Sequence, residues 1–184
     1  PTLNAMEQGG FWKTMKKAVF GDEQRSPTME IQTERRNGSE FGSLHDGALR
    51  ITWLGHSSML IEIEGKLLIT DPIWSERASP VHFAGPKRFY DVPLDLFSLP
   101  KLDGVLISHD HYDHLDMYTT KVLAKTGVPF FVPLGVGSHL EYWGVPKERI
   151  HEMDWWEEHQ LEGGLRIAAT PSRHFSGRGL TDRD

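Results

Sequence analysis

The chain has 184 residues, of which 38% are hydrophobic, and this is enough to bury the core of one domain. Its formal net charge of −6 argues against a nucleic-acid partner, because a surface that binds nucleic acid needs an excess of cations to neutralise phosphates. Cysteine is absent, which excludes disulfides and thiolate metal sites, so any metal must be held by histidine and carboxylate side chains.

Residues 1–47 differ in pattern from the rest of the chain. The segment 9–21, GGFWKTMKKAVFG, predicts a short basic amphipathic helix that either docks on its own domain or lies on a membrane surface; its short length favours docking. A polar, turn-rich linker follows. The sequence contains no recognisable secretory signal or transmembrane segment, so we expect a cytoplasmic protein or one that contacts a membrane peripherally.

Residues 48–184 predict an α/β domain, a mixed β-sheet with helices on its outside. A long, proline-rich loop over residues 74–100 interrupts the pattern, and loops of this length are uncommon unless they are functional. Helices are predicted at 117–127 and 137–144. The predicted strands are 49–54, 58–64, 66–70, 102–108, 128–133, 149–154 and 165–171.

The sequence SHDHYDHLD, Ser108–Asp116, directly follows the apolar strand at 102–108. His109 and His111 are two residues apart, so in extended backbone they point the same way and can reach one ion. Asp113 and His114 lie where the chain turns into the next helix and can serve a second ion. Because α/β sheets place their sites at the carboxyl ends of strands, this pattern predicts a divalent-metal site.

The motif HDHYDH resembles the signature of the metallo-β-lactamase fold superfamily. Other stretches resemble the branch of that superfamily that contains N-acylphosphatidylethanolamine-hydrolysing phospholipase D, and together they cover about residues 49–184. These stretches are ITWLGHSSMLIEIEGKLLITDPIWSERASP, FAGPKRF, FFVPLGVG, DWWE and HFSGRGL.

This resemblance implies a zinc-dependent hydrolase with two ions on an αββα sandwich, with Mn²⁺ or Fe²⁺ as alternative ions. His109, His111 and His174 would bind the first ion, and Asp113 and His114 the second. Asp113 would also orient a metal-bound hydroxide, the nucleophile that attacks the phosphodiester of an N-acylphosphatidylethanolamine-like phospholipid. A lactone or another small-molecule ester is the alternative substrate on the same fold.

Five further residues are candidates around the metals and the substrate. Asp71 and His56 are candidates to orient the metal ligands, although a strand-ending Asp-Pro turn also explains Asp71, and the role of His56 stays open. Lys87, Arg88 and Tyr90 are candidates to bind substrate phosphate and to line its pocket. A solvated basic turn is the alternative for this segment.

The family pattern also requires a bridging aspartate and a further histidine, and neither follows His174 in this sequence. We therefore expect residues 48–184 to form the N-terminal half of the sandwich, which needs the C-terminal half or another subunit to cover one sheet face and to complete the site. On its own such a chain would bind zinc weakly, and a catalytically silent fragment is the remaining alternative.

Overall fold

The computed structural model describes residues 16, 20, 21, 24, 26–44, 47–172, 174, 176 and 178. The chain divides into two compact units, Pro1–Ile31 and Gln32–Asp184. Within the predicted N-terminal helix, Lys16 and Phe20 are described and are helical, Gly21 is described and is not helical, and the rest of that prediction lies outside the described residues.

The division between the units comes earlier in the chain than the predicted boundary after residue 47. Part of the predicted linker belongs to the larger unit, because the backbone N–H of Arg36 donates to the Pro93 carbonyl at 2.8 Å and the ring of Phe41 is buried in the core. A single apolar side chain in a polar segment gave too weak a signal to predict this packing.

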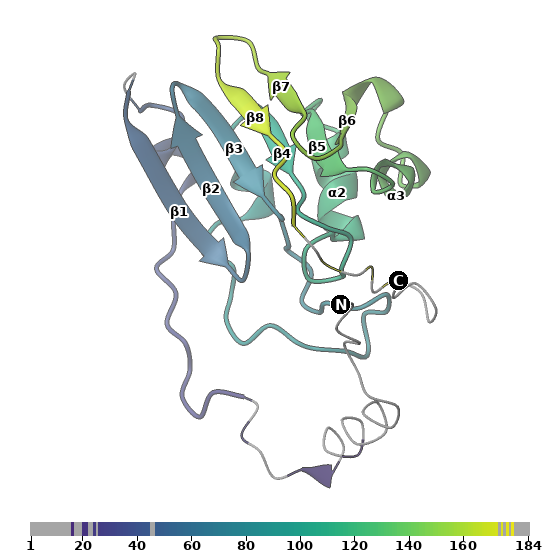
Figure 1. The fold of residues 1–184 in the computed structure, drawn as a ribbon. Helices are drawn as coiled ribbons and strands as arrows, with labels where there is room; N and C mark the ends of the chain where they lie inside the picture. The colour runs from purple at the N-terminus through teal and green to yellow at the C-terminus, as the bar shows by residue number, and fades with distance from the viewer. Residues whose placement is uncertain are drawn as a thin grey trace. The chain divides into compact units, whose positions relative to one another are not determined.

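A six-stranded sheet in the order β1-β2-β3-β4-β5-β6 is the frame of the larger unit (Figure 1). Its first three strands are antiparallel, and β3 to β6 run parallel. The strands are β1 (Leu49–Gly55), β2 (Ser58–Ile63), β3 (Lys66–Thr70), β4 (Gly104–Leu106), β5 (Phe130–Pro133) and β6 (Ile150–Met153). The predicted mixed α/β sheet is therefore confirmed.

The remaining elements are a hairpin and short helices. The hairpin pairs β7 (Glu158–Gln160) with β8 (Arg166–Ala168), and β7 was not predicted because its polar sequence lacks apolar alternation. The helices α2 and α3 confirm the two helices that were predicted after residue 48. Their bounds, with those of the 3₁₀ turns, are α2 (Met117–Ala124), α3 (Gly137–Tyr142), η1 (Gly38–Glu40), η2 (Leu96–Ser98) and η3 (Lys147–Arg149).

The main core lies between the sheet and its helices. Alternate residues of the central strands, such as Ile69, Val105 and Phe130, are fully buried and belong to the same cluster as Leu123 of α2 and Leu140 of α3. A buried aliphatic or aromatic side chain contributes roughly 1.5–3 kcal/mol relative to exposure. This packing holds the carboxyl ends of β3 and β4 in place.

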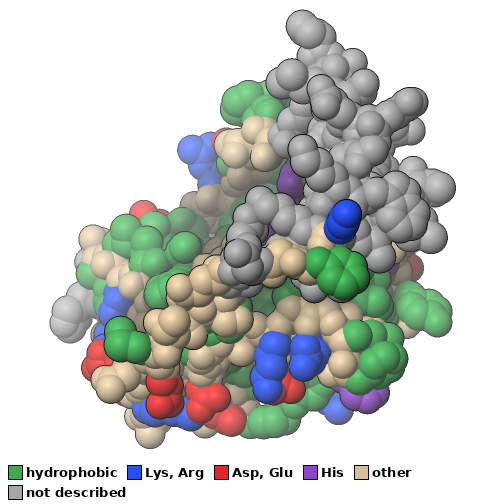
Figure 2. All heavy atoms as spheres, turned by 90° about the horizontal axis from the view of Figure 1, so that it is seen from below, with side chains coloured by type: hydrophobic (Ala, Val, Ile, Leu, Met, Phe, Trp, Pro, Cys, Tyr) green, Lys and Arg blue, Asp and Glu red, His purple; other side chains and the backbone are tan. Residues whose placement is uncertain are grey.

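The opposite face of the sheet is also apolar but is covered unevenly. The hairpin β7–β8 lies on this side, where the ring of His159 is 4.9 Å from that of Phe131 (Figure 1). On β1, however, the side chains of Leu49, Ile51 and Trp53 are more than half exposed. Seen from below in Figure 2, hydrophobic side chains are interspersed with basic and acidic ones.

Among the residues that the structure describes, no helix is long and apolar enough to cross a membrane.

Candidate metal centre

Three histidines converge beyond the carboxyl end of β4, and we call them the three-histidine group: His109, His111 and His174. Their ring centroids are 4.6–4.7 Å apart, and Nε2 of His174 is 3.3 Å from Nδ1 of His111. One ring nitrogen of each lies within 4.8 Å of the others. His174 comes from the segment after β8, so the fold brings together residues separated by 63 positions in the chain.

The loop after β4 positions the first two of these rings. Backbone N–H groups of His114 and Leu115 both donate to the carbonyl of His111, at 3.0 and 2.8 Å, and so close one helical turn. Asp116 then caps α2 by accepting from the Tyr118 N–H. This turn begins at His111 and is followed directly by a capped helix, so it fixes the backbone at His111.

A second set of donors lies beside the first, and we call it the mixed group: His56, Asp113 and His114. Nε2 of His56 is 3.0 Å from Oδ2 of Asp113, and Nε2 of His114 is 3.8 Å from the same oxygen. One ring nitrogen or carboxylate oxygen of each of the three residues lies within 4.8 Å of the others. His56 comes from the turn between β1 and β2, which the antiparallel meander places next to the end of β3.

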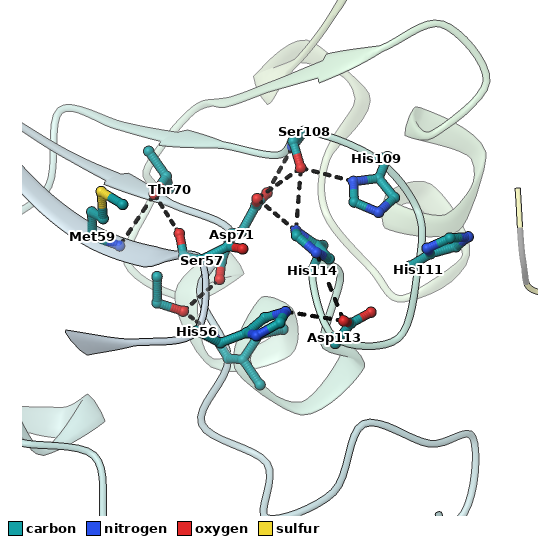
Figure 3. A network of polar contacts seen from close by, with 12 residues as sticks. His56, Ser57, Met59, Thr70, Asp71, Ser108, His109, His111, Asp113 and His114 are labelled. Carbon is teal, nitrogen blue, oxygen red and sulfur yellow. Dashed lines mark hydrogen bonds and ion pairs between the residues drawn. The ribbon is translucent and has the colours of Figure 1, made fainter. Parts of the chain in front are cut away.

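A buried carboxylate connects the two groups (Figure 3). Asp71 accepts from Nδ1 of His114 at 2.8 Å, and from both the backbone N–H and the hydroxyl of Ser108 at 2.7 Å. The Ser108 hydroxyl has one proton, which it gives to Asp71, so its oxygen accepts from Nδ1 of His109 at 2.9 Å. The carboxylate thus fixes the tautomer of one histidine in each group and leaves Nε2 of each ring with its lone pair.

His109 has the features of a metal ligand in its neutral form. Its Nε2 atom is buried, and no described residue offers it a hydrogen bond. Burial, followed by the nearby rings of His114, His111 and His174, lowers the pKa of His109 to about 4. Because a metal binds the unprotonated nitrogen, this ring is ready for an ion at neutral pH.

The mixed group is electrostatically different. Burial lowers the pKa of His114, but the hydrogen bond and the charge of Asp71 outweigh that effect, so the pKa is raised overall. Burial raises the pKa of Asp113, but its backbone N–H and the rings of His114 and His56 outweigh it and lower the pKa. Asp113 is therefore ionised at neutral pH, and the donors present fit a divalent ion bound by nitrogen and oxygen.

A pocket of about 520 Å³ opens beside the mixed group. Lys87, Arg88 and Tyr90 all line it, together with His56 and Asp113, so the structure brings the predicted substrate-binding residues to the site. Its other lining residues are His111, Ile73, Ser75, Glu76, Ala78, Pro86, Phe89 and Tyr112.

The three predicted substrate-binding residues are held in different ways. Lys87 is half-exposed and forms an ion pair with Glu76 at 2.5 Å. Arg88 donates to the Ile73 carbonyl at 2.8 Å, its guanidinium lies 5.5 Å from the centre of the Tyr90 ring, and its Nε is buried with no hydrogen-bond partner among the described residues.

The structure also identifies two residues that sequence reasoning missed. Ser108 links Asp71 to His109. It directly precedes the motif HDHYDH, and this position was the sequence signal that could have identified it. Arg178 donates to the carbonyls of Asp110 and Leu115, and its guanidinium lies 4.3 Å from the centre of the Tyr112 ring. It thereby ties the histidine loop to the segment that carries His174, a contact without a local sequence signal.

Residues 67–184 match the sequence profile of a family described as the β-lactamase superfamily domain. An uncharacterized protein of Mycobacterium tuberculosis is 51% identical over 136 residues, which are 72% of this chain and 36% of that protein. N-acyl-phosphatidylethanolamine-hydrolyzing phospholipase D 1 of Caenorhabditis elegans is 37% identical over 147 residues, 76% of this chain and 41% of that enzyme. The chain thus spans less than half the length of these curated relatives.

Among solved structures, Igni18, a metallo hydrolase from the archaeon Ignicoccus hospitalis, has a similar fold. Its TM-score is 0.52 at 25% sequence identity, and the match covers 71% of this chain and 51% of that one.

Proposed function

The chain belongs to the β-lactamase superfamily, and we propose that its three-histidine and mixed groups, completed by the C-terminal half of the fold or by another subunit, hold two divalent metal ions with which the protein hydrolyses a phosphodiester. The observation that carries the proposal is the buried Nε2 of His109, which lacks a hydrogen-bond partner among the described residues and lies among the other donors. A buried polar atom of this kind costs stability unless a ligand satisfies it.

Zinc suits these nitrogen and oxygen donors, and Mn²⁺ or Fe²⁺ are the alternative ions. When bound, such ions would lower the pKa of a water ligand towards about 7 and so would supply hydroxide at neutral pH. The chain's own residues then have distinct tasks. Asp113 accepts the proton of the attacking water and orients it, and Asp71 holds His114 in the tautomer that leaves Nε2 free.

The pocket supports a substrate that combines an anionic phosphate with apolar groups. Lys87 and Arg88 lie on its wall beside the aromatic rings of Phe89, Tyr90 and Tyr112. Similarity to a worm phospholipase D named for N-acylphosphatidylethanolamine supports the same substrate class. We therefore propose an N-acylphosphatidylethanolamine-like phospholipid as the substrate.

The test begins with the chain together with the complementary half of the fold, freed of metal and then reloaded with Zn²⁺, Mn²⁺ or Fe²⁺. Each form is assayed on bis(4-nitrophenyl) phosphate, on an N-acylphosphatidylethanolamine in detergent and on a simple lactone. We expect metal-dependent cleavage of both phosphodiesters, with little turnover of the lactone. Dominant lactone turnover would assign the site to ester hydrolysis, and equal activity with and without metal would rule out a metal-dependent enzyme.

His82→Ala is the matched control for variants of the metal-binding histidines. His82 is an exposed histidine outside both groups and does not line the pocket. We expect this variant to keep the metal content and the activity of the wild-type protein.

A further inference from the structure

The turn that carries His56 has a strained backbone. His56 has φ +49° and follows Gly55 at φ +115°, so two successive residues lie outside the region that most L-residues adopt. A left-handed conformation in a residue other than glycine costs free energy and persists only where the surroundings enforce it. Such strain concentrates at functional sites, so the contacts that hold this turn are informative.

Three hydrogen bonds hold the turn in place. The Trp53 indole N–H donates to the His56 carbonyl at 2.8 Å, which ties the turn to its own strand. The Thr70 hydroxyl donates to the Ser57 carbonyl at 2.9 Å. The Ser58 hydroxyl donates to the Asp71 carbonyl at 2.6 Å, and these two bonds anchor the turn to the end of β3.

Tyr90 limits the turn from the other side. A Cβ atom on Gly55 would lie only 2.2 Å from the Tyr90 hydroxyl oxygen, so the backbone and the ring are in close contact. The turn is therefore held between the pocket wall and the end of β3. The imidazole that it presents has a defined position although half of that side chain is exposed.

The imidazole points at Asp113 (Figure 3). The separation of 3.0 Å between Nε2 of His56 and Oδ2 of Asp113 is that of a hydrogen bond. It is shorter than the roughly 3.3 Å that separates two ligand atoms of tetrahedral zinc with bonds of about 2.0 Å. A carboxylate oxygen accepts hydrogen bonds, so the N–H of this pair belongs to His56.

We propose that His56 is a positioning residue: its N–H holds the carboxylate of Asp113 in the orientation in which that group and His114 face one metal ion. This inference rests on the proposed two-metal function. It assigns His56 to the orientation of a ligand and not to the set of ligands. Partners of metal-ligating side chains in this role typically account for 10–100-fold in metal affinity or activity.

The experiment compares His56→Gln with His56→Leu in the full chain. Both residues replace histidine at the same strained backbone position, but only glutamine keeps an N–H near the place of Nε2. Metal-free protein is titrated with Zn²⁺ against a chromophoric chelator, and with Co²⁺ to record the visible absorption of the bound ion. Thermal unfolding of the metal-free proteins checks that both variants are folded.

We expect His56→Leu to weaken one of the two ions roughly 10–100-fold and to leave the other within about twofold of wild type. His56→Gln should keep both affinities within about threefold, with a Co²⁺ spectrum like that of the wild type. Equal affinities in wild type and His56→Leu would overturn the proposal. Loss of the same ion in His56→Gln, with a changed spectrum, would also overturn it, because His56 would then be a ligand.

The same titration separates this proposal from the one on which it rests. A wild-type protein that takes up no second ion overturns the two-metal function, and the role of His56 with it. A wild-type protein that takes up two ions while His56→Leu takes them up equally well overturns only the role of His56.

Discussion

The two ligand groups lie side by side but are held by different forces. The three-histidine group contains no carboxylate and its rings lie against one another; burial, followed by the neighbouring rings, lowers the pKa of His109 to about 4. The mixed group has a carboxylate of its own, and a second one, Asp71, holds His114 directly. The fold thus brings neutral rings together in one group, and hydrogen bonds to charged carboxylates hold the other. Substitutions in the two groups should therefore have different effects on metal binding.

Removal of a ligand should have the largest effect. We expect His109→Ala to abolish phosphodiesterase activity, a loss greater than the roughly 10–100-fold typical of residues that only orient ligands, because the first ion loses one of its three histidines. The bound zinc should fall by about one ion per chain, measured by atomic absorption. Far-UV circular dichroism should match that of wild type, and unchanged turnover would remove His109 from the mechanism.

Substitution of the shared carboxylate should have an intermediate effect that separates the groups. Asp71→Asn keeps the side-chain size, and asparagine tolerates the positive φ of 37° at this position. The variant loses the ionised acceptor for His114 and for Ser108, so we expect metal affinity to fall roughly 10–100-fold. The ion of the mixed group should weaken more, because Asp71 contacts His114 directly and reaches His109 only through Ser108.

Competitive zinc titration of Asp71→Asn and of the control Asp91→Asn checks this ranking. Asp91 is an exposed residue that pairs with Arg35 and belongs to neither group. A variant that weakens both ions equally would contradict the view that the carboxylate serves the groups unequally.

This comparison also shows which features of the site have a local sequence signal. The strand that ends at 108, the alternation of His109 and His111 and the helix that follows were all predictable, because periodicity and strand ends are local properties. The bonds from Asp71 to Ser108 and to His114 join residues 37 and 43 positions apart. Their existence depends on the parallel pairing of β3 with β4, which no single segment encodes.

The same reason explains what was missed elsewhere. Phe41 joins the core, and Glu62, a buried carboxylate in β2, pairs with Arg50 and accepts from the Gly42 N–H at 2.8 Å. These contacts bring part of the predicted linker into the larger unit. From sequence alone, a charged side chain in a strand of alternating polar and apolar residues is predicted to be exposed to solvent, because its ion-pair partner is not known.

A smaller effect should appear in the pH dependence of the metal-free protein. Between pH 6.5 and about 4 the unfolded chain binds a proton at His109 that the folded chain does not, so stability falls as the pH falls through this window. His114 acts in the opposite direction: its stabilising contribution is fully present below its ordinary pKa and is lost as the pH rises through its raised pKa.

Nuclear magnetic resonance titration of the ring signals measures both midpoints. We expect His109 to titrate near pH 4 and His114 above pH 6.5. Urea unfolding at pH 7 and pH 4.5 measures how much the free energy of unfolding falls between these pH values. In His109→Ala this fall should be up to about 2 kcal/mol smaller than in wild type, after allowance for the partial exposure of the ring. A single midpoint near 6.5 for both rings would remove the electrostatic difference between the groups.

The smallest effect is expected at the pocket, which the mixed group lines with both His56 and Asp113. Lys87 is half-exposed and its ion pair with Glu76 is open to solvent, so Lys87→Gln should leave the melting temperature unchanged. If the cation attracts an anionic phosphodiester, KM should rise roughly two- to fivefold at low salt while kcat stays constant, and the difference should shrink as salt screens the charge. Lys101→Gln, an exposed lysine outside the pocket, is the control. If Lys87→Gln also raised the KM for a neutral lactone, Lys87 would contribute to the shape of the pocket and not to the attraction of an anionic substrate.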